Sequence, residues 1–214
     1  MPVRDTTILY AVRHGETEWN TAGRQQGHLD SVLTENGITQ ARFLAEGLQG
    51  RGIEYLYSSD LGRARQTAEF IAAGLGLPVQ TDSRLREQHL GCMQGMTQAE
   101  FLARFPELSA LLEYGDPDRG YPGGESPRQH YERCVACCQE LAERHPGGRL
   151  LVVAHGGVLN CLLVHALGKK LLEPRRFSLF NAAINSFQIA NGSWRLDTWG
   201  DIAHLKDVGT LDED

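Results

Sequence analysis

Two histidines, each followed by a glycine, hold positions in this sequence that favour chemistry. His14 comes directly after the apolar run Thr7 to Arg13, and His155 comes directly after Leu150 to Ala154. Both runs are typical of buried β-strands. In an open α/β sheet, ligands bind beyond the carboxyl ends of the strands, and a glycine there lets backbone and ligand approach closely. One such histidine is usually structural, but the pair predicts a shared binding site.

Arginines indicate which ligand the histidines meet. Arg13 precedes His14, and Arg63 lies in the first turn of a predicted helix. A cation at that end of a helix is unfavourable, so we expect Arg63 either to point to solvent or to be compensated by an anion. Guanidinium groups beside a helix N-terminus form a phosphate receptor. They would repel a divalent cation held by His14, Glu87 and His155, so we expect no metal and no cofactor.

The elements that position these residues alternate along the chain. Apolar runs predict strands at Thr7 to Arg13, Tyr55 to Ser58, Val79 to Thr81 and Leu150 to Ala154. Periodicity and capping residues predict helices at Glu35 to Gln49, Gly62 to Ala73, Pro127 to His145 and Gly157 to Leu167. Asn191-Gly192 predicts a closing hairpin of Ile184 to Ala190 with Ser193 to Thr198. The order implies an α/β fold, a three-layer α/β/α sandwich with a mostly parallel central sheet.

Length, composition and charge limit the remaining possibilities. The 214 residues, 41% of them hydrophobic, indicate a single domain, residues 1–214, and exclude a disordered or fibrous chain. Residues 88–126, with two helices around Pro106 and an irregular loop from Gly115 to Gly124, are expected to form a lid. The net charge is −6, and Asp197 to Asp214 contributes six acids against Lys206. We therefore expect no nucleic-acid partner and a solvated acidic tail, about residues 201–214.

The apolar runs and the cysteines predict a cytoplasmic protein. The longest apolar stretches, Leu150 to Ala154 and Val158 to Leu167, are shorter than the ~20 residues of a membrane span, and the N-terminus lacks a signal-peptide pattern. We therefore expect neither a membrane contact nor export. Five cysteines are an odd number without zinc-ligand spacing, and Cys134 and Cys138 share the apolar face of a predicted helix. They are expected to be core residues in a reducing compartment.

Several motifs follow one another along nearly the whole chain. They are Leu9 to Asn20 (LYAVRHGETEWN), Gln26-Gly27, Leu33 to Gly37, Ser58 to Ala68 (SSDLGRARQTA), Leu85 to Glu87, Gly124 to Ser126, Val153 to Gly156 and Gly200 to Leu205. Together they resemble the histidine phosphatase superfamily, the phosphoglycerate-mutase-like proteins, and the ending is similar to its small phosphatase-type members. The resemblance implies the same fold and metal-independent phosphoryl chemistry.

The resemblance also implies roles for single residues. His14 is the expected nucleophile, which takes the phosphoryl group on a ring nitrogen, a reaction suited to neutral imidazole. Arg13, Arg63 and His155 are expected to bind the equatorial oxygens of the transition state. Glu87 matches the proton donor to the leaving oxygen. Asn20, Gln26 and Gly156 are expected to contact phosphate or substrate.

Glu87 keeps a second interpretation. On spacing alone it could equally be a surface carboxylate paired with Arg84 or Arg86. Other residues near the motifs are expected to be structural: Glu16, Thr17 and Trp19 as braces of the His14 loop, Arg65 as a solvated helix residue, and Glu125 and Ser126 as the start of a helix. No role is assigned to His28, His89, His130, His145 and His165.

The choice between hydrolysis and transfer depends on the segment after Glu87. True cofactor-dependent mutases carry a longer insertion there, with a lysine and paired arginines, whereas Gln88 to Gly124 contains no lysine and no Arg-Arg pair. The sequence therefore favours hydrolysis of a small-molecule phosphomonoester. Mutase-type transfer and a non-catalytic phosphate-binding module are the alternatives. A phosphoglycerate, a sugar phosphate or α-ribazole phosphate would all fit, Gln94 replaces a glutamate common in the family, and the sequence gives no signal of oligomeric state.

Overall fold

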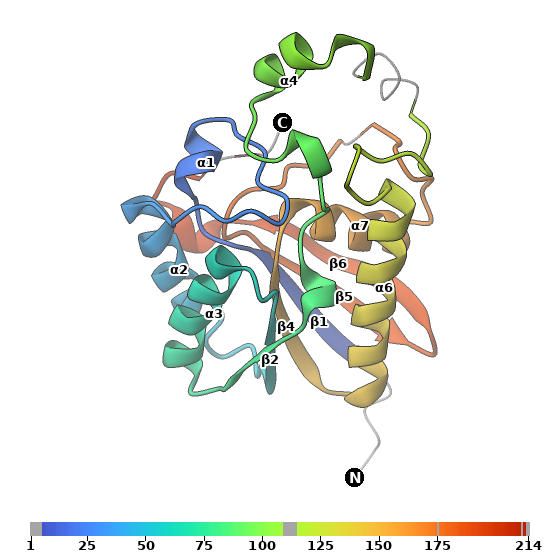
Figure 1. The fold of residues 1–214 in the computed structure, drawn as a ribbon. Coiled ribbons are helices and arrows are strands. Elements are labelled where there is room, and N and C mark those ends of the chain that lie inside the picture. The colour runs from blue at the N-terminus through green and yellow to red at the C-terminus, as the bar shows by residue number, and fades with distance from the viewer. Residues whose placement is uncertain (1–5, 109–114, 175, 211, 213–214) are drawn as a thin grey trace.

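The computed structural model describes residues 6–108, 115–174, 176–210 and 212 (Figure 1). Six strands form one sheet in the order β3-β2-β4-β1-β5-β6. They are β1 Thr7–Arg13, β2 Tyr55–Ser58, β3 Val79–Thr81, β4 Arg149–Ala154, β5 Ile184–Ala190 and β6 Ser193–Asp201. The first four strands are mutually parallel, and β5 and β6 form an antiparallel hairpin at one edge. The predicted sheet and hairpin are confirmed.

Helices cover both faces of the sheet (Figure 1). The α-helices are α1 Glu18–Thr21, α2 Glu35–Gly47, α3 Gly62–Leu75, α4 Gln98–Arg104, α6 Pro127–Arg144 and α7 Gly156–Ala166; 3₁₀ turns are η1 Ser83–Leu85, η2 Gly91–Met93 and η3 Ala203–Leu205. Alternate residues of β1 point to opposite faces. Leu9 packs in the cluster under α6 and α7, and Tyr10 in the cluster under α2 and α3. The three-layer sandwich is therefore confirmed.

The parallel register of β1 and β4 brings their ends together. Arg13 lies opposite Ala154, and the backbone N–H of His14 donates to the carbonyl of Ala154 over 3.0 Å. His14 and His155 therefore leave the sheet side by side. On the far side of β4, the backbone N–H of Ser59 donates to Val153 and adds the end of β2 to the same edge.

Helix α6 forms as its sequence predicts. Ser126 and Gln129 make a capping box, and Pro127 occupies the first turn. Cys134 and Cys138 are buried in the core with no disulfide bond, which confirms their prediction as small core residues. None of the helices in the described ranges combines the length and apolarity needed to cross a bilayer.

The part of the chain between β3 and α6 that carries η2 and α4 lies beyond the carboxyl ends of the parallel strands (Figure 1). It contains η2, α4 and an irregular stretch from residue 115 to 124. Of the two helices predicted around Pro106, the first is α4; of the second only residues 106–108 are described, and 109–114 lie outside the described ranges. Arg24 ties this segment to the loop after α1 by an ion pair with Glu100 of 2.7 Å.

The C-terminal segment differs from the expectation of a solvated tail. The carbonyl of Gly209 accepts hydrogen bonds from the side chains of Asn36 and Gln40 on α2, and Thr210 donates to the carbonyl of Asn181. Leu205 is buried under the same helix layer. The Gly209 carbonyl, the Thr210 hydroxyl and the apolar side chains of Ile202, Leu205 and Val208 thus hold residues 201–210 on the domain despite their acidic composition, so the prediction of a solvated tail was wrong there. Residues 211, 213 and 214 lie outside the described ranges.

Candidate active site

His14 is held in one tautomer at the end of β1. Its Nδ1 lies 2.8 Å from the carbonyl oxygen of Gly15, and its Nε2 lies 3.2 Å from Nε of Arg63. The carbonyl can only accept and the guanidinium can only donate, so Nδ1 carries the proton and Nε2 presents a lone pair. Burial is the main reason that the pKa of His14 lies well below its usual value, and Arg63 and Arg13 lower it further. The ring is neutral at neutral pH.

Arg63 is buried, with 2% of its surface exposed. Its guanidinium donates to the carbonyls of Gly27 and Leu29 and forms an ion pair of 3.0 Å with Asp30. The Asp30 carboxylate also accepts the backbone N–H groups of Gly62 and Arg63, which open α3. The compensating anion predicted for Arg63 is therefore a side chain of the protein. Because Asp30 caps α3, the expectation that this helix N-terminus receives phosphate was wrong.

Arg13, the last residue of β1, contacts the segment that precedes β5. Its Nη1 donates to the carbonyl of Leu179 over 2.6 Å, and its own carbonyl accepts from Ala182. Asn181 donates from Nδ2 to the carbonyl of His14 over 2.9 Å. Nothing in the sequence signals Asn181, because its partner is 167 positions away.

His155 packs against the ring of His14. Its ring centroid lies 5.2 Å from that of His14, and its Nε2 lies 2.8 Å from Oγ of Ser59. Its buried Nδ1 has no hydrogen-bond partner within the described residues. Burial, followed by Arg63 and then His14, holds the pKa of His155 well below its usual value. His155 joins the cluster as expected, but it is buried and does not line the cavity.

A cavity of about 590 Å³ opens over the two guanidinium groups. Seven of the eight residues predicted for the site line it: Arg13, His14, Asn20, Gln26, Arg63, Glu87 and Gly156. Its outer wall adds residues that the sequence did not indicate, chiefly Arg24, Gln25, Gln88, Leu90 and Asn160. Trp19 also lines the cavity and is therefore more than the brace that the sequence predicted. No three His, Cys, Asp or Glu side chains of the described ranges are grouped so that they could hold a metal ion.

The N-terminus of α7 meets this cavity at Gly156. His155 is the cap residue, but its side chain makes no capping hydrogen bond. The N–H of Gly157 donates to Oε2 of Glu87 over 2.9 Å. The Glu87 carboxylate therefore takes a first-turn N–H of α7, as the Asp30 carboxylate does in α3. Gly156, the first residue of α7, lines the cavity beside it.

Glu87 is fixed by backbone donors rather than by arginines. Its Oε1 accepts the N–H of Gln88 over 2.7 Å, and its side chain is 13% exposed. Arg84 and Arg86 turn away from it: Arg84 pairs with Asp82 and Arg86 with Asp60. The interpretation of Glu87 as the ion-pair partner of either arginine was therefore wrong.

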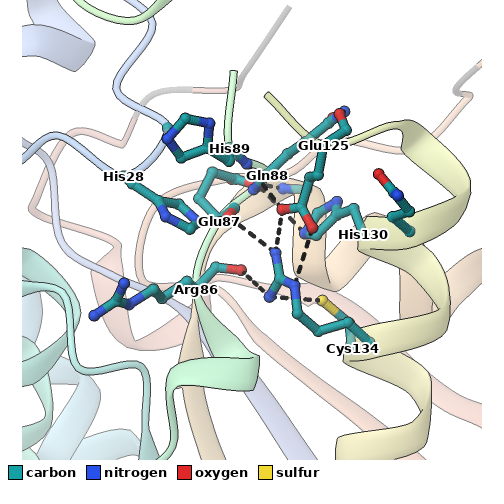
Figure 2. Close-up of polar contacts among 12 residues, drawn as sticks. His28, Arg86, Glu87, Gln88, His89, Glu125, His130 and Cys134 are labelled. Atoms are coloured by element: carbon teal, nitrogen blue, oxygen red, sulfur yellow. Dashed lines mark hydrogen bonds and ion pairs between the residues drawn. The ribbon is translucent and has the colours of Figure 1, made fainter. Parts of the chain in front are cut away.

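Arg133 of α6 holds the segment that carries Glu87. It donates to the carbonyls of Arg84, Arg86 and Glu87 over 2.8, 2.9 and 3.2 Å. Glu125 forms an ion pair with Arg133 and accepts the backbone N–H of His89. Figure 2 shows these contacts gathered between the two segments. The role of Arg133 could not be predicted from the sequence, because nothing in its helical position distinguishes it from a solvated arginine.

The loop after His14 is braced by side-chain hydrogen bonds, as predicted. Thr17 donates from its hydroxyl to Oδ1 of Asn20 and accepts from Nε2 of Gln26. Glu16 accepts from the hydroxyl of Thr34 over 2.6 Å. Asn20 and Gln26 therefore help to hold the loop in addition to lining the cavity.

Three further positions complete the comparison with the sequence. Arg65 is exposed and pairs with Glu69, as predicted for a solvated helix residue. Gln94 accepts the N–H of His28 through Oε1, a contact that a glutamate could also make. Asp212 was missed: its Oδ1 accepts the N–H of Leu179 over 2.6 Å, and it lines the cavity.

Fold and site together define an α/β protein with a buried neutral histidine between two arginines. Residues 9–202 match the Histidine phosphatase superfamily (branch 1). The chain belongs to this superfamily, which confirms the resemblance seen in its motifs.

Relatives span nearly the whole chain. The phosphoglycerate mutase-like protein 4 of Arabidopsis thaliana is 40% identical, over 97% of this chain and 90% of its own length. Among solved structures, Bacillus stearothermophilus YhfR has a TM-score of 0.84 at 32% identity and covers 92% of this chain and 98% of its own. The mycobacterial glucosyl-3-phosphoglycerate phosphatase Rv2419c, in complex with VO3, has a TM-score of 0.78 at 35% identity, covering 91% and 98%. Phosphatases and mutase-like proteins among the relatives support an enzyme.

Proposed function

We propose that this protein is a phosphomonoesterase that hydrolyses small phosphorylated metabolites through a phosphohistidine on His14. The observation that carries the proposal is the tautomer of His14: Nδ1 is bound to the Gly15 carbonyl, and the lone pair of Nε2 faces Arg63. Neutral imidazole is a competent nucleophile at neutral pH, and the low pKa of His14 keeps it neutral.

Phosphate binding would use the positive groups of the cavity. Arg13 and Arg63 both line it, and Gly156 offers the N-terminus of α7. A phosphoryl group entering between Arg63 and His14 takes over the guanidinium as its own hydrogen-bond donor and releases the Nε2 lone pair. His155 lies against His14, where its unpartnered Nδ1 can turn to an equatorial oxygen once the ligand is bound.

The first chemical step forms the bond between Nε2 of His14 and phosphorus and breaks the ester P–O bond. Glu87, on the cavity wall, donates a proton to the departing oxygen, so the alcohol leaves neutral. In the second step, water attacks phosphorus, the P–N bond breaks and inorganic phosphate forms. Glu87 takes the proton of that water and is again the acid that began the cycle. The charges on the phosphoryl oxygens are balanced by Arg13 and Arg63 throughout.

We also propose that the reaction needs no metal ion. Two permanently charged guanidinium groups within the cavity provide the charge stabilisation that a divalent cation supplies in other phosphoryl-transfer sites. They also repel such a cation. The segment of residues 88–126 is proposed as the lid, because Gln88 and Leu90 belong to the cavity wall and α4 lies beyond the strand ends.

Hydrolysis is proposed over transfer to a second substrate. Among the residues that the structure describes, the cavity wall contains no lysine, and Arg24 is its one arginine besides Arg13 and Arg63; Arg24 is engaged by Glu100 and the carbonyl of Gly95. A mutase must hold a second anionic substrate in place of water. By its name, Rv2419c is a phosphatase of glucosyl-3-phosphoglycerate, whereas the Arabidopsis relative is named mutase-like, so transfer is the alternative to test.

The test offers 3-phosphoglycerate, sugar monophosphates and p-nitrophenyl phosphate to the enzyme with and without EDTA. We expect inorganic phosphate from at least one natural ester class, at a rate unchanged by the chelator. With 3-phosphoglycerate and 2,3-bisphosphoglycerate together, phosphate release should exceed formation of 2-phosphoglycerate. Rapid isomerisation without phosphate release would favour the mutase alternative, and loss of activity in EDTA that a metal restores would remove the metal-free mechanism.

A further inference from the structure

His130 is a buried histidine beside Glu87 that the mechanism above does not use. It lies in the second turn of α6 with 3% of its surface exposed. Its Nε2 lies 3.7 Å from Oε1 of Glu87 and has no hydrogen-bond partner within the described residues. Its Nδ1 lies 3.7 Å from Sγ of Cys161 on α7. Figure 2 shows His130 facing the segment that carries Glu87. A buried ring nitrogen without a partner is costly, so its position beside a carboxylate calls for a function.

We propose that His130 is a positioning residue for Glu87. His130 shares one proton with the Glu87 carboxylate and thereby keeps part of that carboxylate in its acid form at neutral pH. The inference rests on the proposed acid role of Glu87. It adds a residue that acts only through Glu87.

The geometry separates His130 from substrate. Glu87 lines the cavity, whereas His130 does not. Gln88 and Gly157 donate one backbone N–H each to the two carboxylate oxygens, so each oxygen keeps a further acceptor site. The site on Oε1 that faces the core is the one within reach of His130. A separation of 3.7 Å is an ion-pair distance, and contacts of this kind tighten when a ligand binds.

Gly157 shows how closely this pair is enclosed. A Cβ at position 157 would lie 2.9 Å from Cε1 of His130 and would collide with Oε1 of Glu87. Only a glycine lets the N-terminus of α7 approach both side chains. The backbone of Gly157 therefore packs against both side chains of the pair.

The charges around His130 allow it to hold the shared proton. Six titratable or charged groups face His130. Arg133 and Cys134 belong to α6, Cys161 to α7, Glu87 to its own segment, His155 to the end of β4 and Glu125 to the end of the lid segment. Burial opposes protonation, but Cys134 and Glu87 favour it, and the pKa of His130 is raised overall. The charge of Cys134 contributes only as a thiolate, and burial raises the pKa of Cys134 well above its usual value, so at neutral pH the charge that favours protonation of His130 is that of Glu87. Glu87 is then the nearest anion that His130 can neutralise.

Sharing has a specific kinetic consequence. Two coupled groups lose their common proton in one macroscopic step that belongs to the pair. While the pair holds one proton, a constant fraction of the enzyme carries it on Glu87, which is the reactive acid form. Activity with a poor leaving group should therefore stay level until the pair deprotonates. Without His130 no proton is shared, so activity with a poor leaving group should begin to decline at lower pH.

The experiment measures kcat/KM against pH for glycerol 3-phosphate and p-nitrophenyl phosphate in wild type, His130→Gln and His130→Leu. We expect the descending limb for glycerol 3-phosphate to move to lower pH by ~1 unit or more in both variants. Gln can still donate a hydrogen bond but cannot titrate, so a shift in His130→Gln assigns the effect to the proton. The limb for p-nitrophenyl phosphate should not move, because its leaving group departs without a proton.

His28→Gln is the matched control. His28 is also close to this segment, with Nε2 at 2.9 Å from the backbone carbonyl of Glu87, and glutamine can keep that contact. We expect its descending limb to coincide with that of wild type. If His130→Leu does not fold, as a thermal melt would show, His130→Gln decides alone.

The outcomes separate this inference from the proposed function. Absence of a phosphoenzyme on His14 in wild type would remove the proposed function itself. A phosphoenzyme that forms, together with unmoved limbs in the His130 variants or equal fractional losses for both esters, would overturn the role of His130 alone. A limb that moves for glycerol 3-phosphate and stays for p-nitrophenyl phosphate supports it.

Discussion

Nε of Arg63 lies 3.2 Å from Nε2 of His14, so the same guanidinium orients the ring that we propose as the nucleophile and lines the cavity in front of it. This contact requires the planar fork of arginine, because the remaining donors of Arg63 are held by Gly27, Leu29 and Asp30. A lysine carries the charge on one nitrogen and cannot satisfy these directions together.

Arg63→Lys should therefore retain the positive charge but no longer orient the ring of His14. We expect single-turnover phosphorylation of the enzyme to fall by ~10² to 10³, the range found when one preorganised donor is removed. The measurement is rapid quench with labelled substrate. Arg65→Lys, two residues along α3 on its exposed face, is the control and should match wild type. Equal rates for Arg63→Lys and Arg65→Lys would contradict the orienting role.

Stability should depend on pH through the two buried histidines. The pKa values of His14 and His155 lie well below the usual 6.5 in the folded protein, chiefly because of burial. As pH falls below 6.5, the unfolded chain binds protons that the folded protein excludes, so stability is present above 6.5 and declines below it. Each histidine can contribute up to ~1.4 kcal/mol per pH unit.

Urea unfolding at pH 7.5, 6.5 and 5.5 checks this linkage in wild type and His14→Gln. The free energy of unfolding should decline less steeply below pH 6.5 in the variant, because one of the excluded protons is gone. Surface carboxylates are the same in both proteins and cancel in the comparison. Parallel pH curves would mean that His14 is protonated as easily in the folded protein as in the unfolded chain.

Part of this site could be predicted from sequence for a plain topological reason. His14 and His155 follow strands whose apolar runs mark them as central and parallel, and parallel strands end at one edge. The capping box at Ser126 and Gln129 is likewise local, since its partners are three residues apart. Short-range patterns therefore located His14, His155 and the helix α6.

The parts that sequence did not reveal depend on contacts between distant residues. Asp30 caps α3 from 32 positions away, and Arg133 binds the carbonyl of Arg84 from 49 positions away. Such bonds from a side chain to backbone leave no periodicity in either segment. Helix α1 has four residues, too few for a helical repeat to be seen. Asp212 lies in an acidic stretch whose composition alone indicates a solvated tail.

Asp212 should oppose anionic ligands. Its carboxylate lies on the cavity wall and binds the N–H of Leu179, whose carbonyl holds Arg13. We expect Asp212→Asn to lower KM for phosphomonoesters severalfold, since removing a negative charge near the phosphate site reduces repulsion. Steady-state kinetics at low ionic strength measure the effect, with Asp207→Asn on the exposed surface as the control. An unchanged or higher KM in Asp212→Asn would show that this carboxylate does not repel substrate.

Glu87→Gln should slow phosphoenzyme formation in proportion to how much the leaving group needs a proton. General acid catalysis is worth ~10² to 10⁴, so phosphoenzyme formation should fall by about that factor with glycerol 3-phosphate and much less with p-nitrophenyl phosphate. Glu69→Gln, an exposed carboxylate on α3, serves as control. Equal fractional losses for the two esters would leave the role of proton donor unassigned.

Detection of the phosphoryl group on His14 tests the proposed mechanism most directly. Rapid quench of the enzyme with labelled phosphomonoester, followed by peptide mapping, should reveal an acid-labile, base-stable phosphoryl group on the peptide that carries His14. His14→Ala should form none, whereas His145→Ala, which alters a histidine just before the amino end of β4, should label as wild type does. The label on His14 should appear before inorganic phosphate is released and should decay at the rate of phosphate release. Turnover that leaves no label on His14, or label that persists in His14→Ala, would contradict it.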